Sequence, residues 1–482
     1  MTIDSIDIET TIKNVEQMLR EDKDISAAMV SAIKVLLLVV KLLAGRLGLN
    51  SRNSSKPPAS DPHREKTRRA TSDKPVGGQA GRTGTTLLPI DEPDEIHDIA
   101  IDQRRLPRGH YRDVGVERRQ VFDIRIERHV TEYRAQILES DDGMRFVAEF
   151  PHGVTRPAQY GAAVRANAVY MSMFQLIPYE RVQTHFDELF GLPLSSGTLC
   201  NFNHDAYERL ALFEALAKKC LAQSVVIHAD ETSINVDGQR LWLHNASNSE
   251  WTLFHPHPKR GSDAMNAIGV LPAFRGTLVH DHWKPYYLYE HCTHALCNAH
   301  HLRELTFAFE EDGQRWADDL RTLLLAINTA VKTAGGSLSM PEARPWRNRY
   351  RQLLNEAEHE CPAPEPQEGV RKRGRIKRSK SRNLLERLRD YEDDVLRFME
   401  NGSVPFTNNR GERDIRMTKV QQKISGCFRS MGGAQVFCRI RSYLSTCRKH
   451  GVGVGEALER LFRDEWPDFI QEKLDGMKEG AE

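Results

Sequence analysis

A short apolar stretch that ends on an acidic residue places the strongest constraint on how this 482-residue chain folds. Residues 225–227 read Val-Val-Ile and stand out from the polar sequence before them. β-Branched side chains in a short apolar run favour a buried strand. Asp230 follows where this strand leaves the core, so the fold has to bring a carboxylate to the edge of a covered sheet.

The segments after this strand continue in an order that is typical of an α/β core. The predicted elements are strands at 225–236, 240–246 and 251–256, a helix at about 263–271, a strand at 277–280 and, at 296–309, a short strand or turn that continues as a helix. Three strands, a helix, a strand and a helix form the order expected of a ribonuclease-H-like core, in which helices cover a mixed sheet.

Two further acidic residues, like Asp230, lie in or directly after a predicted helix or strand. Asp281 directly follows the predicted strand at 277–280, and Glu412 lies in a predicted helix at 409–417. Phosphodiester cleavage needs an activated oxygen nucleophile and neutralised phosphate charge, and divalent metals held by carboxylates supply both. Hard oxygen ligands suit Mg²⁺ or Mn²⁺. We therefore expect Asp230, Asp281 and Glu412 to meet, to bind the metal and to be catalytic in phosphoryl transfer on nucleic acid.

Each of these carboxylates also has a simpler explanation. Strand alternation puts Asp230 and Glu231 on opposite faces, so at most one of them points into the site. Asp281 can cap the turn that follows it, and Glu412 with Arg416 has the spacing of an ordinary i,i+4 helix pair. Isolated acidic residues are usually solvated surface residues, so spacing alone leaves the assignment open.

Histidine and cysteine are concentrated shortly after Asp281. The cluster consists of His291, Cys292, His294, Cys297, His300 and His301. Zinc prefers these side chains, but their spacing follows no common finger pattern, and a free cysteine is often simply buried. For His300, a phosphate contact or a supporting role beside the carboxylates is the alternative.

Basic residues surround Glu412 in the sequence. The candidates for DNA binding are Arg410, Arg413, Arg416, Lys419, Lys423 and Arg429. Arginines beside a carboxylate either form structural ion pairs or hold the phosphates next to the point of cleavage. Asn408 and Asn409, which precede this group, suit a helix N-cap.

The N-terminal part is predicted to be a helical domain followed by a linker. Within residues 1–50, a helix is expected from about 8 to 49, and it indicates either a self-associating coiled coil or an amphipathic helix packed on its own chain. Its a/d seam consists of Met29, Ile33, Leu36, Val40, Leu43 and Leu47. Residues 51–90 are basic and rich in Ser, Pro and Gly, which predicts a flexible linker, either a phosphate-backbone clamp or a solvated spacer.

Two regions are expected between the linker and the core. Residues 91–150 alternate apolar and polar side chains, most clearly at 121–130 and 133–138, which predicts a small β-rich module. The module has no cysteine, which excludes a cysteine zinc ribbon. Residues 151–222 are predicted to be helical, with Ser195 or Ser196 as a cap, and the helices either bind DNA as a helix-turn-helix or simply pack together.

The core is expected to be interrupted before Glu412. Residues 223–310 form its first part, and residues 311–402 form a helical insertion that contains the basic run 371–382, which has no acidic residue. Residues 403–482 complete the core with Glu412 and with C-terminal helices at 435–449 and 454–463.

Composition indicates the cellular compartment of the protein but not its binding partner. The net charge of +1 says nothing about partners. All 8 cysteines lie at or after Cys200 without a Cys-x-x-Cys pair, which indicates a reducing, cytoplasmic compartment rather than a disulfide framework. No signal-peptide pattern is present, and the longest apolar run, residues 35–40, is far shorter than the roughly 20 residues that cross a bilayer, so no membrane partner is expected.

Several motifs resemble those of transposases of the insertion-sequence-66 family. The most specific is the block at 404–417, Val-Pro-Phe-Thr-Asn-Asn-Arg-Gly-Glu-Arg-Asp-Ile-Arg-Met, and the likeness continues through 423–430 and 441–446. Segments around Asp230, Asp281 and Cys297 are similar to family segments in the same order, and residues 54–58 and 77–81 resemble the family's N-terminal part. The resemblance covers nearly the whole chain.

The resemblance implies an Asp-Asp-Glu transposase of a mobile genetic element, with a ribonuclease-H-like catalytic domain. It implies that Asp230, Asp281 and Glu412 hold Mg²⁺ or Mn²⁺, and that the partners are element ends and target DNA, further copies of the chain and helper proteins encoded by the element. Many relatives carry a cysteine-based zinc module between the linker and the helical region, and this chain lacks those cysteines. A metal-dependent nuclease of the same fold without strand transfer, or an inactive DNA-binding relative, is the alternative.

Overall fold

The computed structural model describes residues 2–3, 6–22, 25–47, 50, 52–54, 87–364 and 378–479. Most of the predicted linker, at 55–86, and residues 371–377 of the basic run lie outside the described residues. The chain forms two compact units, of which residues 65–132 are one and the remainder is the other. All three candidate carboxylates belong to the larger unit.

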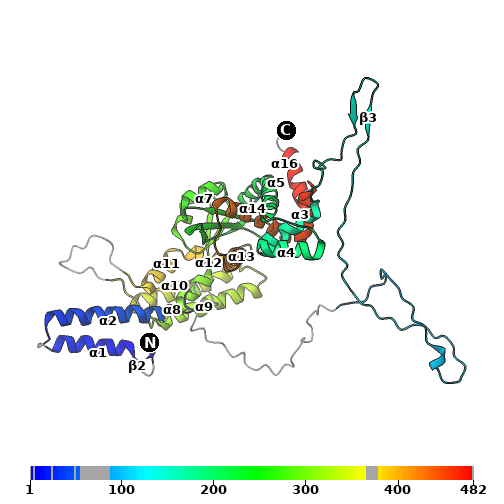
Figure 1. Ribbon diagram of the computed structural model, residues 1–482. Helices are drawn as coiled ribbons and strands as arrows, with labels where there is room; N and C mark the ends of the chain where they lie inside the picture. Colours follow the sequence, from blue (N-terminus) through cyan, green and yellow to red (C-terminus); the bar gives the residue numbers. More distant parts are fainter. Residues whose placement is uncertain are drawn as a thin grey trace. The chain divides into compact units, whose positions relative to one another are not determined.

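A five-stranded mixed sheet forms the centre of the larger unit, in the strand order β7-β6-β5-β8-β9 (Figure 1). The antiparallel neighbours are β5 (Val226–Val236), β6 (Gln239–Ser247) and β7 (Thr252–His257). On the other side, β8 (Thr277–His280) pairs in parallel with β5, and β9 (Thr293–Leu296) pairs in parallel with β8. The four strands predicted between residues 225 and 280 are confirmed to within one residue at each end.

Local sequence explains the long hairpin of β5 and β6. Asp237 and Gly238 join the strands with φ values of 48° and 72°. Two successive left-handed residues are the requirement of a type I′ hairpin turn, which Asp-Gly meets well. Ile227, Ile234 and Val236 of β5 are buried, but Val225, the first residue of the apolar run that was expected to be buried, precedes β5 and is exposed.

Helices cover the sheet and link its strands. α7 (Ser262–Ile268) lies between β7 and β8 in the chain, and α8 (Asn298–Glu310) follows β9. α13 (Asn409–Ser425) packs on β5 and β6, whereas α14 (Met431–Lys449) packs on β7. The α/β class predicted for the core is therefore confirmed.

The described residues between α8 and α13 are mostly helical, as predicted for residues 311–402. It consists of α9 (Arg315–Thr333), α10 (Met340–Glu360), α11 (Lys380–Asp390) and α12 (Glu392–Glu400). Arg347 of α10 joins the two ends of α12, because its guanidinium contacts Glu392 at 2.9 Å and Glu400 at 2.7 Å. Apolar residues of all four helices share one buried cluster with α8 and β9.

Helices also precede and follow the core. The preceding ones are α3 (Ala162–Val169), the π-helical turn η3 (Tyr170–Phe174), α4 (Tyr179–Phe190), α5 (Ser196–Arg209) and α6 (Ala211–Ala222). Ser195 caps α5 as predicted, because its hydroxyl accepts the N–H of Thr198 at 3.0 Å. At the C-terminal end, α15 (Val454–Phe462) was expected, whereas α16 (Asp468–Glu479) was not.

The expectation of one long N-terminal helix is wrong. After two-residue strands β1 (Thr2–Ile3) and β2 (Ile6–Asp7), the chain forms α1 (Ile8–Glu21) and α2 (Ala27–Leu47). Ser26 starts the second helix, since its hydroxyl accepts the N–H of Met29 at 3.3 Å. Lys41 of α2 contacts Glu16 of α1 at 2.7 Å, so the two helices pack against each other.

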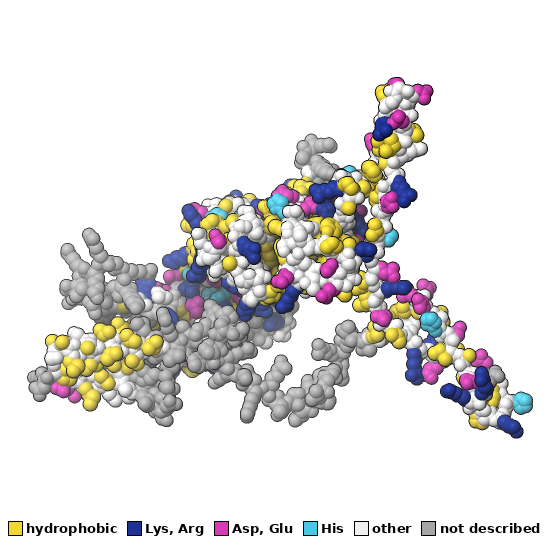
Figure 2. Space-filling view, in the orientation of Figure 1, with side chains coloured by type: hydrophobic (Ala, Val, Ile, Leu, Met, Phe, Trp, Pro, Cys, Tyr) yellow, Lys and Arg dark blue, Asp and Glu magenta, His cyan; other side chains and the backbone are white. Residues whose placement is uncertain are grey.

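Apolar residues of α2 nevertheless remain on its surface. Met29, Leu36 and Leu43, three members of the predicted seam, are all exposed. Figure 2 shows hydrophobic side chains gathered on this hairpin. Among the described residues, no helix combines the length and hydropathy that a membrane crossing requires.

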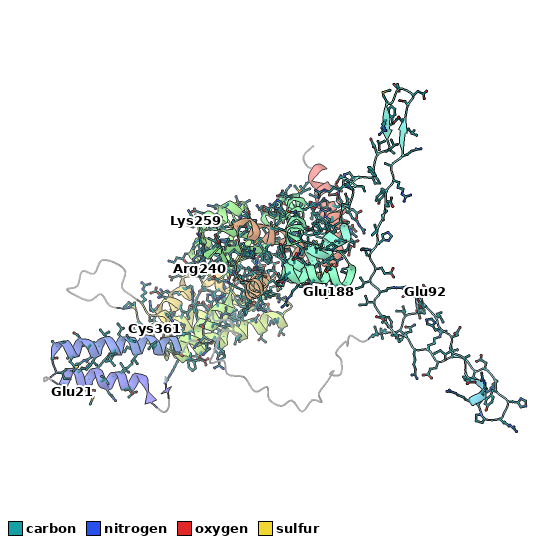
Figure 3. All side chains as sticks on the ribbon, in the orientation of Figure 1. Glu21, Glu92, Glu188, Arg240, Lys259 and Cys361 are labelled. Atoms are coloured by element: carbon teal, nitrogen blue, oxygen red, sulfur yellow. The ribbon has the colours of Figure 1, made fainter. Side chains whose placement is uncertain are left out.

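The predicted β-rich module at 91–150 is also wrong. Residues 121–130 contain no strand, and the region holds only a short 3-10 turn, η2 (Gln103–Arg105), and one hairpin of β3 (Ile137–Glu139) and β4 (Arg145–Val147). All side chains of both strands are exposed, and Figure 3 shows side chains of this region, Glu92 among them, standing along an extended backbone. Alternation gives a stable sheet only where another layer covers its apolar face.

Candidate active site

The register of the sheet brings Asp230 and Asp281 to neighbouring positions. β5 and β8 pair in parallel, with residues 226–228 opposite residues 277–279. Extended by two residues, the same register sets Asp230 beside Asp281, one residue past the end of β8. The two acidic residues therefore lie on adjacent strands.

Asp230 carries a buried carboxyl group in a strongly negative environment. Its Oδ1 accepts the backbone N–H of Glu231 at 2.9 Å. Burial raises the pKa of Asp230 well above its usual range, and the charges of Glu231, Asp281 and Glu412 raise the pKa further. The four carboxyl groups thus share one electrostatic neighbourhood, in which a bound cation would relieve their repulsion.

Asp281 also shapes the turn that follows β8. Its Oδ1 accepts the backbone N–H of Trp283 at 3.1 Å, which confirms the turn-capping interpretation. His282 between them has a left-handed backbone, with φ of 68°. Because Asp281 also raises the pKa of Asp230, the capping role and a place in the acidic site are compatible.

Glu412 lies in the first turn of α13, which Asn408 fastens to β5. The side-chain amide of Asn408 donates to the carbonyl of Ala229 at 2.8 Å, and its Oδ1 lies 2.7 Å from Nδ1 of His228. Asn408 occupies the N-cap position but its side chain does not cap α13, contrary to expectation, because the amide bonds to β5 instead. Within the described structure Glu412 forms no ion pair with Arg416.

Glu231 is held by a separate set of contacts. Arg260 donates to its Oε1 from Nε at 2.9 Å and from a terminal nitrogen at 2.6 Å, and the hydroxyl of Tyr286 donates to Oε2 at 2.5 Å. The Arg260 guanidinium also lies over the rings of Trp242 and Trp283, 4.8 and 4.1 Å from their centroids. Only 1% of the Glu231 side chain is exposed, so this carboxylate is committed to structural bonds.

The histidine and cysteine cluster does not converge on one point. His291 bonds to the carbonyl of Leu271, and Cys292 donates to the carbonyl of Tyr289. His280 and His294 contact each other at 3.1 Å, while His301 bonds to Asn298. These four members of the cluster therefore have other partners.

Cys297 and His300 instead approach Glu412. The sulfur of Cys297 lies 3.9 Å and Nδ1 of His300 lies 3.8 Å from Oε1 of Glu412. Burial raises the pKa of the Cys297 thiol to about 11 and lowers the pKa of His300 below its usual value of 6.5. Across the part of the chain that the structure describes, these three residues are the one group whose ligand atoms all lie within 4.8 Å of one another.

Most basic residues around Glu412 are free to contact a partner. Arg410, Arg413, Arg416, Lys423 and Arg429 are exposed and make no ion pair with any described residue. Lys419 differs, because its ammonium group donates to the carbonyl of Ser233 at 2.5 Å and is half-buried. Five of the six predicted DNA-binding side chains thus remain on the surface, and the sixth fastens α13 to β5.

Arg410 and Arg413 also line an open groove of about 700 Å³. His228, Asn248 and Lys473 contribute to its wall, together with backbone and side chains at the start of β5. None of the three candidate carboxylates lines this groove, but Thr407 and Asn409, on either side of Asn408, do. Its basic lining suits a phosphate backbone.

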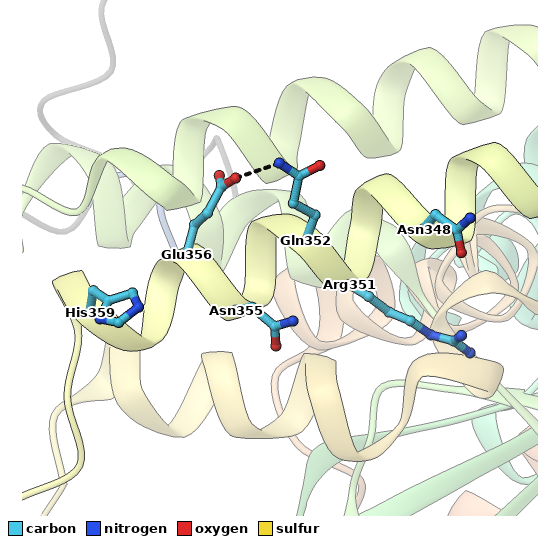
Figure 4. Close-up of a pocket in the computed structure, with 6 residues that line it drawn as sticks. All are labelled: Asn348, Arg351, Gln352, Asn355, Glu356 and His359. Atoms are coloured by element: carbon cyan, nitrogen blue, oxygen red, sulfur yellow. Dashed lines mark hydrogen bonds between the residues drawn. The ribbon is translucent and has the colours of Figure 1, made fainter.

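A second hollow lies on α10, away from the carboxylates. It is lined by Asn348, Arg351, Gln352, Asn355, Glu356 and His359. Figure 4 shows these side chains on a single helix, with a 2.8 Å hydrogen bond between Gln352 and Glu356. A strip of one helix offers no converging groups, so this hollow is not part of the site.

Sequence reasoning missed the residues that hold Glu231 in place. Arg260 and Tyr286 follow β7 and β8 in loop or 3-10 segments, and no spacing connects them with Glu231. Asp230 and Glu231 lie within β5 and not where the strand leaves the core, contrary to expectation. The one signal in the sequence was this adjacent pair, since carboxylates that become buried require a counter-charge.

Comparison with known proteins identifies the class of this molecule. The family model described as Transposase IS66 family matches residues 157–436, a segment that contains the whole sheet, the helices α8 to α13 and the three candidate carboxylates. The match marks the protein as a transposase. Because it spans more than half of the chain, the protein belongs to the IS66 transposase family.

The N-terminal part matches a different model. A family of unknown function (DUF6444) covers residues 7–87, which include the α1–α2 hairpin. No curated protein matches the chain.

Proposed function

We propose that this transposase cuts DNA at element ends and joins the ends to target DNA, with Asp230, Asp281 and Glu412 as its catalytic, metal-binding carboxylates on a ribonuclease-H-like core. The observation that carries the proposal is the environment of Asp230. Charges from two other elements, at Asp281 and Glu412, act on a carboxyl group that is already buried. The strand order, three antiparallel strands followed by two parallel ones, agrees with the core expected from the sequence.

The donor set fits a hard divalent cation such as Mg²⁺ or Mn²⁺. Three carboxylates offer oxygen ligands, and their mutual repulsion is relieved by positive charge. When bound, the cation neutralises phosphate charge and makes water or a 3′-hydroxyl a better nucleophile. Glu231 stays outside this set because Arg260 and Tyr286 occupy it.

The other residues position DNA in this proposal. Arg410 and Arg413 lie on the exposed face of α13 beside the groove, and Arg416, Lys423 and Arg429 extend the basic surface. Arginine and lysine at such places hold the phosphates on either side of the reacting one without reading sequence. Asn408 and His228 keep Glu412 in register with Asp230.

Strand transfer in a defined reaction tests the proposal. A DNA fragment that ends in the element's own terminus is incubated with target plasmid, Mg²⁺ and protein, and joined products are counted. Asp230→Asn and Glu412→Gln should abolish joining and keep binding to the ends in a mobility-shift assay. Asp237→Asn, an exposed change in the adjoining turn, is the matched control and should join normally.

The same reaction separates the alternatives. Cut ends without joined products would assign a nuclease, and binding without either product in any metal would assign an inactive relative. Full joining by Asp230→Asn would overturn the choice of catalytic residues.

A further inference from the structure

Two helices begin at the same point beside the candidate active site. α8 starts directly after Cys297, and α13 starts directly after Asn408. The N–H of Asn298 donates to the carbonyl of Phe406 at 3.1 Å, and the N–H of Asn408 contacts the sulfur of Cys297 at 3.0 Å. A helix N-terminus favours negative charge, and a backbone N–H that points at sulfur stabilises a thiolate.

Three potential metal ligands converge at this point. Cys297 and His300 are three residues apart around the first turn of α8, a spacing that puts both side chains on one side of the helix. Glu412 reaches them from α13, with its Oε1 3.9 Å from the sulfur and 3.8 Å from Nδ1 of His300. The ligands thus come from two elements that the contacts above hold together.

The free nitrogen of His300 points to a missing partner. Nδ1 is buried and has no hydrogen-bond partner in the described structure, although 24% of the side chain as a whole is exposed. Buried polar atoms are nearly always paired, and a bound ion is one of the few explanations for an exception.

We propose that Cys297, His300 and Glu412 bind a transition-metal ion of the zinc class. A tetrahedral ion at usual bond lengths separates sulfur from oxygen by about 3.5 Å and nitrogen from oxygen by about 3.3 Å. The observed separations exceed these values by only a few tenths of an ångström, which side-chain rotation alone can close. On binding, the metal–sulfur bond replaces the thiol S–H bond, and one proton leaves to solvent.

The ligand atoms of this site favour a different class of metal ion from the one that the catalytic carboxylates favour. A thiolate and an imidazole select zinc, cobalt or similar ions and disfavour Mg²⁺. Three protein ligands leave a fourth position open, as in catalytic rather than structural zinc sites. The proposal goes beyond the proposed function and shares only Glu412 with it. Both contacts fall on Oε1, so Oε2 stays available to a cation at Asp230.

Cobalt spectroscopy on the full-length protein tests this site. Metal-stripped protein is titrated with Co²⁺, and absorption is followed in the visible and in the near-ultraviolet, where thiolate-to-cobalt charge transfer appears. We expect one equivalent to give both signals and Zn²⁺ to displace it. Cys297→Ser should remove the charge-transfer band, and His300→Gln should weaken binding by at least about tenfold.

Control variants show whether the cobalt bands depend specifically on the proposed ligands. Cys200→Ser removes an exposed cysteine of α5 and should leave the bands unchanged. Asp230→Asn should keep the bands while losing strand transfer, so that failure of the metal site and failure of the proposed function are told apart. If Cys297→Ser does not fold, as judged by circular dichroism, His300→Gln decides alone. Wild-type protein without a charge-transfer band, or bands unchanged in both ligand variants, would overturn the proposal.

Discussion

His228 and Asn408, 180 residues apart in the chain, are joined by a 2.7 Å hydrogen bond between Nδ1 and Oδ1. The amide nitrogen of Asn408 donates to the Ala229 carbonyl, so its oxygen is the acceptor and His228 carries the proton on Nδ1. The bond lies two residues before Asp230 and four residues before Glu412. Together with the contact of Lys419 to Ser233, this side chain therefore holds the first and the last candidate carboxylate in position relative to each other.

Replacing Asn408 tests this role. Asn408→Ala removes two hydrogen bonds and leaves buried groups on β5 without partners, which should lower the free energy of unfolding by about 1–3 kcal/mol. Strand transfer should fall further than the loss of folded protein explains, because Glu412 is no longer fixed. Denaturant melts and joining assays measure the two effects, and Asn409→Ala, an exposed neighbour, should be close to wild type. Equal behaviour of the two variants would contradict the role of Asn408.

Buried histidines should make the fold sensitive to acid. Burial lowers the pKa of His228, His244 and His255 to about 4, whereas histidine in an unfolded chain titrates near 6.5. Between about pH 4 and 6.5 the unfolded chain therefore binds more protons than the folded protein does. The free energy of unfolding that these groups contribute is highest above about pH 6.5 and falls as the pH drops toward about 4. Thermal melts from pH 7.5 to 4.5 should show this loss. His244→Asn should flatten the profile, and exposed His152→Asn should not.

Neutralising Asp230 should stabilise the protein while it removes activity. The pKa of Asp230 is raised above 3.8 in the folded state, so stability falls as the pH rises from about 3.8 to the raised pKa and stays lower above it. Asp230→Asn should raise the melting temperature at pH 8 by about 2–4 °C for each kcal/mol of repulsion removed, and the gain should vanish below about pH 3.8. Mg²⁺ should stabilise wild type more than the variant. A lower melting temperature for Asp230→Asn at pH 8 would mean that the charges do not converge.

Arg260 should be needed for the integrity of the site rather than for chemistry. Arg260→Ala leaves the buried Glu231 carboxylate with Tyr286 as its remaining partner, which we expect to cost about 2 kcal/mol of stability and to weaken Mg²⁺-dependent joining. Arg260→Lys keeps the charge but loses the two-nitrogen contact and most of the stacking on Trp283, so it should lie between alanine and wild type. Urea unfolding ranks the three proteins, and an alanine variant as stable as wild type would refute this role.

Gly276 is required where the chain enters β8. A Cβ atom at this position would lie 2.3 Å from the carbonyl oxygen of Val225 and 2.6 Å from that of Ser224, both backbone atoms that cannot move aside. Gly276→Ala should therefore push β8 away from β5 and reduce soluble, folded protein. Gly476→Ala in α16 meets nothing within 4 Å and should be neutral or stabilising by up to about 1 kcal/mol. Circular dichroism and yield after purification compare the two.

The sheet could be predicted because its information is local. β-Branched runs, the Asp-Gly turn and short apolar segments define β5 to β8 without reference to distant residues. The position of Asp281 directly after a strand followed from the same pattern, whereas the pairing of β8 with β5 did not. The contacts of Glu231, by contrast, join residues 29 and 55 positions apart, and no periodicity encodes them.

Two errors have a common physical origin. The alternation at 121–130 and the helical pattern expected from about 8 to 49 are present in the sequence, but a pattern reports only the preference of a segment. Whether Val121 or Ile124 becomes part of a strand depends on a covering layer, and in the described structure both are exposed. Similarly, the pattern did not reveal that a second helix begins after Ser26, whose hydroxyl accepts the N–H of Met29.

The backbone hydrogen bond between Asn298 and Phe406 joins the start of α8 to the segment before α13. The chain therefore returns to the core close to the start of α8. The helices α9 to α12 lie between the two sides of this contact, so their length does not determine the distance between Asp230 and Glu412. Such an inserted segment can be lengthened, shortened or replaced by another folded segment during evolution or in the laboratory, provided that the contact between Asn298 and Phe406 is kept. The spacing of 131 residues between Asp281 and Glu412 thus depends on the length of the inserted segment. The contact between Asn298 and Phe406 is the feature that has to be preserved.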